Sequence, residues 1–261
     1  MKITEYNIKS NKVKENITVA CVSDLHARPA DRVVKALQSI SPDLILMAGD
    51  IFEVANDYMS KRNENALRFF ESTVNIAPIY YCFGNHEIYF SHAAKMDNRL
   101  PTDSMQAELV EKIKSMGITI VNDSFVSENI GQNVINIGGV VCGYDKDPRC
   151  DIDIKKDALD NYSMVKGFKI LLCHYPHYYE KYLKNTDFDL IIAGHAHGGQ
   201  WRIFNRGVYA PHQGLFPKFT SGIYDGRFII STGAVNNSSP IPRFFNPTEI
   251  LKITISKAEE A

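Results

Sequence analysis

Runs of aliphatic residues alternate along the chain with segments whose apolar positions recur at helical spacing. Residues 31–40, DRVVKALQSI, follow the start signal Pro29, and residues 64–74, ENALRFFESTV, repeat the helical pattern. Buried strands are expected around them, at 16–26, 43–50 and 77–87, where the third strand ends in a polar loop. The repeated order of strand, loop and helix predicts a layered α/β fold.

The second half of the chain continues this pattern after one more helix. Residues 104–117, SMQAELVEKIKSMG, are expected to be helical and to stop at Gly117. Further strands are expected at 118–123, 133–144, 168–175, 188–195, 226–233 and 248–255. Residues 202–247 hold many Gly, Pro and aromatic residues, which predict ordered loops and hairpins rather than a linker. We therefore expect one domain spanning residues 1–261.

Composition and charge narrow the class of protein. Hydrophobic residues make up 44% of the chain and charged residues 23%, which is typical of a globular protein and excludes a disordered or fibrous one. The net charge of -1 gives no long-range field that attracts nucleic acid, although a local basic groove is compatible with it. Five cysteines without C-x-x-C spacing, and no apolar stretch of about 18 residues, predict a cytoplasmic protein with reduced thiols.

Polar side chains stand where the predicted strands end. They are Asp24, His26, Asp50, Asn85, His86, His174, His195 and His197. Because the carboxyl ends of parallel strands share one edge of a sheet, five distant segments are expected to converge on one cleft. Imidazole, carboxylate and amide ligands without thiolate favour Mn²⁺, Fe or Zn²⁺. In extended backbone, residues two apart point to the same side, so the DxH and HxH pairs are each expected to form a pincer.

Even seven of these eight side chains exceed the needs of one metal ion. If Asp50 bridges, they divide into two sites that would polarise a phosphoryl oxygen and activate a hydroxide between two ions about 3.5 to 4 Å apart. Each block alone has a structural alternative, because a strand-ending Asp is often a turn residue and a buried His is often a hydrogen-bonded core residue. Their joint occurrence, in this order and at strand ends, favours the metal site.

The blocks D-x-H, GD, GNHE, a strand-ending His and GHxH form the signature of the calcineurin-like metallophosphoesterases. They stand here as SDLH, AGD, GNHE, LLCHYP and GHAH, and the chain resembles that superfamily from Val19 to about Ile253. The resemblance implies a layered α/β sandwich of two mixed β-sheets flanked by helices. It also implies a metal-dependent phosphoric ester hydrolase with two divalent ions, Mn²⁺ before Fe or Zn²⁺.

The same resemblance assigns roles to individual positions. One metal is implied to bind Asp24, His26, Asp50 and His197, and the other Asp50, Asn85, His174 and His195. His86 matches the histidine that contacts phosphate and protonates the leaving oxygen, which suits an imidazole. Glu53 matches the acid that often orients this histidine, with a solvated loop acid as the alternative. Arg28 is either a phosphate ligand or a surface arginine.

The segment that begins at His174 points to one branch of the superfamily. An H-x-P block followed by GHxHGGQ is similar to a bacterial branch with membrane-associated phosphoesterases and hydrolases of UDP-diacylglucosamine type. Many members carry an N-terminal membrane or export segment, which residues 1–16 do not resemble. A peripheral membrane contact is compatible with this branch, and no obligate protein partner is implied.

The leading hypothesis is a binuclear phosphoesterase in which a metal-bridging hydroxide attacks a phosphate monoester, diester or pyrophosphate. Its substrate would be a phosphorylated small molecule, a nucleotide sugar or a lipid pyrophosphate. One alternative is a nuclease, which the near-neutral charge disfavours, and another is a non-catalytic scaffold of the same fold.

The aromatic and basic residues between Tyr209 and Phe245 form either a lip over the metal cleft or internal packing. The remaining histidines, His92, His177 and His212, are expected to be structural or surface residues.

Overall fold

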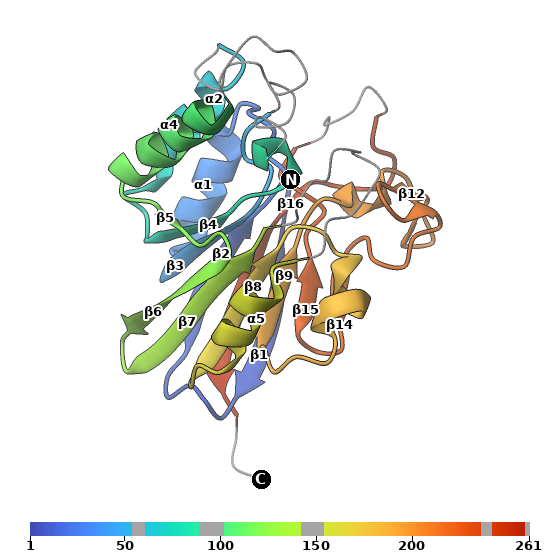
Figure 1. The fold of residues 1–261 in the computed structure, drawn as a ribbon. Helices are drawn as coiled ribbons and strands as arrows, with labels where there is room; N and C mark the ends of the chain where they lie inside the picture. Colours follow the sequence, from blue (N-terminus) through green and yellow to red (C-terminus); the bar gives the residue numbers. More distant parts are fainter. Residues whose placement is uncertain (54–60, 89–101, 142–153, 236–241, 259–261) are drawn as a thin grey trace.

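Two six-stranded β-sheets face each other, with helices on their outer sides (Figure 1). The structure is a computed structural model that describes residues 1–53, 61–88, 102–141, 154–235 and 242–258. Both sheets contain parallel and antiparallel pairs. The layered α/β sandwich of two mixed sheets that the sequence predicts is therefore confirmed.

The first sheet pairs the first strand of the described chain with the last one. Its strand order is β1 (Lys2–Ser10), β16 (Glu249–Lys257), β2 (Ile17–Val22), β3 (Leu44–Ala48), β4 (Ile79–Cys82) and β5 (Thr119–Ile120). Strands β2 to β5 are parallel, whereas β16 runs antiparallel to β2. The strand β3, LILMA, is buried at every position, as expected for a parallel strand covered on both faces.

The second sheet has a parallel centre and antiparallel edges. Its order is β14 (Gly222–Tyr224), β15 (Phe228–Ile230), β9 (Leu190–Ala193), β8 (Phe168–Cys173), β7 (Asn133–Val140) and β6 (Ser124–Ile130). Four short strands form two hairpins beyond β9. They are β10 (Arg202–Ile203) with β11 (Arg206–Gly207), and β12 (Tyr209–Ala210) with β13 (Gly214–Leu215). These hairpins are the ordered loops that the sequence predicts.

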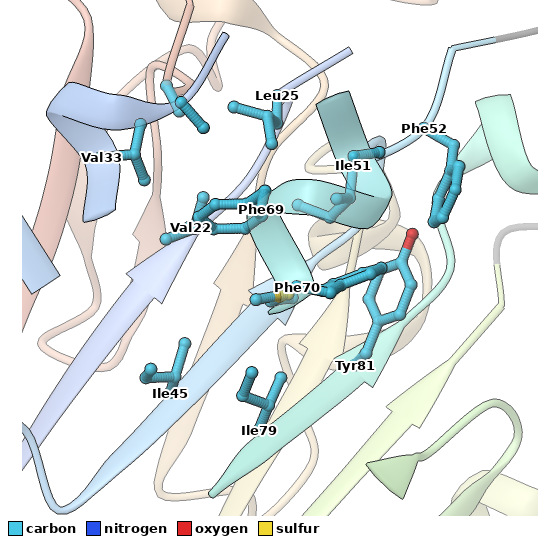
Figure 2. Packing of buried hydrophobic residues seen from close by; sticks show 14 of the residues in the cluster. Val22, Leu25, Val33, Ile45, Ile51, Phe52, Phe69, Phe70, Ile79 and Tyr81 are labelled. Carbon is cyan, nitrogen blue, oxygen red and sulfur yellow. The ribbon is translucent and has the colours of Figure 1, made fainter. Parts of the chain in front are cut away.

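The helices cover the outer faces of the two sheets. They are α1 (Asp31–Ile40), α2 (Glu64–Thr73), α4 (Thr102–Ser115), α5 (Lys156–Ser163), the π-helical turn η1 (Tyr179–Leu183) and the 3₁₀ turn η2 (His197–Gly199). In α1 the buried residues Val33, Ala36 and Leu37 recur at helical spacing, so one face of the helix packs on the first sheet. Helix α2 lays Phe69 and Phe70 over the same sheet (Figure 2).

Three apolar layers hold the sandwich together. The outer layers lie between each sheet and its helices, with Phe70 and Tyr81 in the first and Tyr162 stacked on Phe125 in the second. The middle layer joins the inner faces of the two sheets, where Leu46 of β3 belongs to the same buried cluster as β7 and β8 residues. These layers fix the sheets relative to each other, which fixes the strand ends as well.

Several elements differ from the sequence-based expectation. The strands β1 and β6 and the helix α5 were not predicted, because β1 and β6 are mostly polar edge strands with few buried positions. Residues 85–88 are helical rather than a polar loop.

Cys21, Cys82 and Cys173 are free and buried, as expected, while Cys142 and Cys150 lie outside the described residues. Within the described ranges, the helices are too short or too polar to cross a bilayer.

Candidate metal centre

The ends of five parallel strands meet at one edge of the sandwich. Strands β2, β3 and β4 of the first sheet lead into SDLH, AGD and GNHE, and β8 and β9 of the second sheet lead into His174 and His195. A hydrogen bond joins the two sheets here, because the backbone N–H of His195 donates to Oδ1 of Asp24 over 2.9 Å. The convergence thus involves both sheets rather than one continuous sheet edge.

Five of the seven candidate ligands have a left-handed backbone conformation, not an extended one. Positive φ angles between 46° and 65° occur at Asp24, His26, Asp50, His195 and His197. The extended pincer geometry predicted for the DxH and HxH pairs is therefore wrong. Backbone hydrogen bonds between loops hold these turns. In one of them, the Asp24 N–H donates to the Gly49 carbonyl oxygen over 3.0 Å. Such conformations cost about 1–3 kcal/mol each and cluster at functional sites.

The first group of ligand atoms comes from Asp24, His26 and His197. One atom from each lies within 4.8 Å of the others, and all three residues are buried. The Nε2 atoms of His26 and His197 are 3.3 Å apart, and Nε2 of His197 is 3.5 Å from Oδ1 of Asp24. Two imidazole nitrogens and a carboxylate oxygen thus face a common point.

The second group consists of Asp50, His174 and His195, again within 4.8 Å and buried. Nδ1 of His174 lies 2.6 Å from the Ala48 carbonyl oxygen, which can only accept, so Nδ1 carries the proton. Nε2 of His174 then faces Oδ2 of Asp50 over 3.1 Å, and it would offer its lone pair to a metal ion on loss of its proton. This is the usual arrangement of a metal-binding histidine, in which the remote nitrogen is held by a carbonyl oxygen.

Asp50 lies between the two groups. Its Oδ2 is 3.1 Å from Nε2 of His174 and 3.9 Å from Nε2 of His26. Burial alone would raise the pKa of Asp50, but the His174 and His86 rings lower it well below its usual value. Burial also opposes protonation of His174, whereas the Asp50 carboxylate raises the His174 pKa to about 10. The site between Asp50 and His174 therefore stabilises a positive charge, because the Asp50 carboxylate stays ionised and attracts it.

Several buried polar atoms of this cluster have no hydrogen-bond partner in the described part of the chain. They are Oδ2 of Asp24, Nδ1 of His26, Oδ1 of Asn85, Nε2 of His174 and Nε2 of His195. Buried polar atoms are normally paired, and each exception needs a physical explanation. An oxygen and nitrogen donor set that converges without partners fits divalent ions of intermediate hardness.

Gly49 permits the close approach of the AGD loop to His174 and to the GNHE loop. Gly49 has φ of +88°, and a Cβ atom there would lie 2.5 Å from Nδ1 of His174 and 2.7 Å from Cα of Gly84. Any side chain at position 49 would separate the β3 loop from His174. The glycine of the AGD block is thus required by packing as well as by its backbone angle.

His86 stands beside the cluster and is held by Glu53. Nδ1 of His86 lies 2.8 Å from Oε1 of Glu53, and Nε2 lies 3.8 Å from Oδ2 of Asp50. Burial lowers the pKa of His86, but the charges of Asp50 and Glu53 outweigh it and raise the pKa to about 9. Glu53 is only 8% exposed and does not have the solvated environment of a surface loop acid.

Arg28 lies apart from the convergence. It is exposed and lines a hollow with Asp31, Arg32 and Val235, on the side where α1 begins. Across the described ranges, no ion pair links its guanidinium to the candidate ligands. The structure thus brings Asp24, His26, Asp50, Asn85, His86, His174, His195, His197 and Glu53 into one region, and leaves Arg28 at its periphery.

Glu87 is a residue whose role the sequence did not reveal. It is fully buried, and its carboxylate accepts three backbone N–H groups, from Gly84 at 2.7 Å, Phe52 at 2.9 Å and Asp50 at 3.0 Å. Burial and the neighbouring Asp50 raise its pKa. Glu87 thereby ties the GD loop to the GNHE loop. The sequence feature that could have revealed this role is the position of Glu87 as the last residue of the GNHE block, in which only Asn85 and His86 were assigned roles.

Arg243, one of the basic residues between Tyr209 and Phe245 that the sequence offers as a lip over the metal cleft, lies beside the candidate ligands. Its Nη2 lies 3.2 Å from Nδ1 of His197. Its Nε and Nη1 atoms are buried without a hydrogen-bond partner among the described residues. Burial lowers the Arg243 pKa to about 10, a value at which the guanidinium is still charged near neutrality. A cation with two unused donors therefore borders the candidate metal ligands.

The ring of His212 lies against His195, and His177 lies on the other side of His212. The rings of His195 and His212 are 5.3 Å apart, and His212 stacks on His177 with an interplanar angle of 14°. A packing role for both rings is compatible with the expectation that they are structural or surface residues. His92 lies outside the described residues.

A sandwich of two mixed sheets with nitrogen and oxygen ligands at the strand ends is the architecture of a metal-dependent phosphoesterase. The chain matches the calcineurin-like phosphoesterase family over residues 17–199. It therefore belongs to this family of phosphoric ester hydrolases, and the class predicted from the sequence is confirmed.

Curated relatives resemble the chain at low identity, two of them over nearly its whole length. An uncharacterised protein of Bacillus subtilis, YpbG, is 24% identical over 92% of this chain and 82% of its own length. An uncharacterised metallophosphoesterase of Campylobacter jejuni, Cj0846, is 27% identical over 97% of this chain and 63% of its own length. The phosphodiesterase YaeI of Escherichia coli is 26% identical over 62% of this chain and 51% of its own length. The chain thus spans less than two thirds of the last two relatives.

Among solved structures, the chain is similar to the phosphopantetheinyl hydrolase of Mycobacterium tuberculosis. The identity is 12%, the TM-score is 0.47, and the match covers 84% of this chain and 89% of that one.

Proposed function

We propose that the chain is a binuclear-metal-dependent phosphoesterase that hydrolyses a phosphate monoester, diester or pyrophosphate. The main support is the set of buried, unpartnered oxygen and nitrogen atoms in two neighbouring groups, with Asp50 between them. A non-catalytic scaffold would have no need to keep every one of these strained, desolvated positions.

One ion would be held by Asp24, His26, Asp50 and His197, and the other by Asp50, Asn85, His174 and His195. The donor set suits Mn²⁺ best in our proposal, with Fe or Zn²⁺ as alternatives. When bound, the two ions would polarise a phosphoryl oxygen and supply a hydroxide nucleophile between them.

The chain's own residues would handle the proton and the negative charge. Since Nδ1 of His86 is engaged by Glu53, Nε2 is the nitrogen that would donate a proton to the leaving oxygen. Arg243 would donate its Nε and Nη1 hydrogens to phosphate oxygens, because buried guanidinium donors need charged acceptors. Arg28, in the peripheral hollow, would contact a more distant anionic part of the substrate.

The substrate in this proposal is a phosphorylated small molecule, a nucleotide sugar or a lipid pyrophosphate, handled by residues 1–261 as one domain. The GHxHGGQ block, in which Gly198 packs against Asn246, supports placing the chain in the bacterial branch with UDP-diacylglucosamine hydrolases. A nuclease is the second candidate, and the chain's charge of -1 favours a small substrate instead.

The proposal is tested by metal analysis together with hydrolysis of an aryl phosphodiester under Mn²⁺. Asp50→Ala and His195→Ala should each lose bound metal and at least a hundredfold in kcat. Met164→Asn, at an 82% exposed position that caps the C-terminus of α5, is the matched control and should keep both the bound metal and the activity. Wild-type activity in Asp50→Ala would contradict the scheme, and an absence of tightly bound metal would favour the scaffold.

A further inference from the structure

Large apolar side chains stand exposed on the loops that leave the candidate metal centre. They are Ile203, Phe204, Leu215, Phe216, Phe244 and Phe245, called here the apolar rim. Phe204 is 97% exposed and Phe245 is 90% exposed, so neither contributes to the core. A contiguous exposed apolar patch of this kind marks an interaction surface.

The members of the apolar rim are neighbours in space. Ile203, Phe204 and Phe245 line one shallow hollow together with Asn205. Asn205 and Phe216 line the next hollow, so the two hollows are adjoining. These loops project sideways from the two sheets around β12 (Figure 1). The rim is therefore one protruding surface rather than scattered exposed residues.

The backbone holds three of these side chains in an unusual conformation. Phe204, Phe216 and Phe245 have φ angles of 49°, 50° and 52°. Bulky residues rarely adopt positive φ, and each instance costs roughly 1–3 kcal/mol. Asparagine or glycine would suit these turns better and would be more soluble, so the phenylalanines serve something other than the turn.

The segment that carries most of the rim, residues 201–219, is charged with one sign. Residues 201–219 contain Arg202, Arg206 and Lys218 and no acidic residue. Lys218 is paired with Glu180, but within the described ranges the side chain of Arg202 donates hydrogen bonds to neutral groups, the Ser221 hydroxyl and two carbonyl oxygens. Apolar tips surrounded by cationic residues are the pattern of a surface that inserts between anionic lipid headgroups.

A second copy of the chain fits this surface less well. A symmetric dimer brings the same patch against itself, so Arg202 and Arg206 would face their own equivalents. Like charges in a desolvated interface cost free energy, whereas phosphate groups of a lipid surface would neutralise them.

The rim is tied directly to the metal centre. Asn246, next to Phe245, donates to the carbonyl oxygens of His197 at 2.6 Å and Gln200 at 3.1 Å. Nη1 of Arg202 donates to the Gly198 carbonyl oxygen at 3.2 Å. A surface that binds the rim would thus lie beside the candidate ligand His197.

From these contacts we propose that the apolar rim docks the protein on an anionic phospholipid surface and presents the metal centre to phosphate esters of lipid headgroups. The substrate part of this proposal rests on the phosphoesterase function proposed above. The docking part stands on the rim's exposure, backbone conformation and charge.

The test is cosedimentation of the full, Mn²⁺-loaded chain with phosphatidylcholine vesicles that contain or lack phosphatidylglycerol. The wild type should bind the anionic vesicles, and Phe204→Asn with Phe245→Asn should weaken that binding at least tenfold, because each removes an inserting ring. Asparagine tolerates positive φ, so both turns should be preserved, and an unchanged thermal midpoint checks this. Arg206→Glu should weaken binding only to the anionic vesicles.

Met164→Asn removes an equally exposed apolar side chain elsewhere and should bind vesicles like the wild type. Equal binding by the double variant, or no binding by the wild type, overturns the docking proposal. A concentration-dependent dimer that the double variant abolishes, without vesicle binding, assigns the rim to a second copy and also overturns it. Hydrolysis of a water-soluble diester is measured in parallel, so vesicle binding without hydrolysis contradicts the phosphoesterase function alone.

Discussion

Nδ1 of His86 lies 2.8 Å from Oε1 of Glu53, so the ring is fixed by a buried carboxylate on one side and presents Nε2 toward Asp50 on the other. This contact joins the GNHE loop to the GD loop. It fixes the orientation of the proposed proton donor and helps to keep the ring charged. Burial lowers the pKa of His86, whereas the carboxylates of Asp50 and Glu53 raise it to about 9.

Glu53→Gln is expected to lower kcat about tenfold while changing KM little. The amide keeps the size of the side chain but removes the charge, so the pKa of His86 should fall. A proton donor is lost above its pKa, and the alkaline limb of the pH–kcat profile should therefore move to lower pH. An unmoved alkaline limb would show that Glu53 does not act through His86. His86→Ala should remove the limb, and the ordinary range for lost acid catalysis is about 10² to 10⁴ in rate.

Arg243→Ala is expected to lower kcat/KM by about 10² to 10³, because a buried guanidinium with two unused donors would no longer bind phosphate. Arg243→Lys should recover only part of the loss, since an ammonium cannot reproduce the planar fork. Arg68→Ala, an exposed arginine on α2 paired with Glu64, is the control and should be unaffected. Full activity in Arg243→Ala with an aryl phosphodiester would refute the role.

Glu87→Ala is expected to destabilise the protein by about 3–5 kcal/mol. The substitution leaves three buried backbone N–H groups without their acceptor, and each such loss costs roughly 1–3 kcal/mol before relaxation. Urea unfolding measures the change, with metal removed so that ligand binding does not contribute. A change below 1 kcal/mol would mean that Glu87 does not hold the two loops together.

The metal-free protein is expected to lose stability as the pH rises from about 6.5 through about 10, because the pKa values of both His86 and His174 are raised in the folded state, to about 9 and about 10. The His86 pKa is raised in the folded state to about 9, so its contribution is fully present below the unfolded value of about 6.5 and is lost across this window. Burial lowers the pKa of His197 to about 3, which has the opposite effect and removes stability as the pH falls below about 6.5. His86→Gln should reduce the alkaline loss of unfolding free energy and leave the acid side unchanged, while the part that comes from His174 remains. An identical pH profile for this variant would contradict the assignment.

The fold was predictable where buried aliphatic runs are continuous. The strand β3 has no polar interruption, and α1 begins and ends where the sequence indicates. The strand β1 could not be found, because one residue of its nine is buried and its place is set by pairing with β16, far away in the chain.

The candidate site was predictable only as far as its residues form a linear signature. The left-handed backbone of Asp24 depends on a hydrogen bond to the Gly49 loop, which no local pattern encodes. Arg243 reaches His197 from 46 positions away, with no fixed spacing to reveal it. The exposure of Phe204 and Phe245 likewise results from tertiary packing, since aromatic residues in such a segment are more often buried.

The pairing of β1 with β16 also decides how the molecule can be held in an experiment. The two strands are parallel, and β16 runs antiparallel to β2, whose end carries the DxH block. Lys2 therefore lies at the metal-centre edge of the first sheet, and Lys257 lies at the opposite edge, as the positions of the two ends in Figure 1 illustrate. Attachment to a sensor chip through a tag beyond Lys257 would orient the metal centre and the apolar rim away from the support, whereas a tag at Met1 would crowd them.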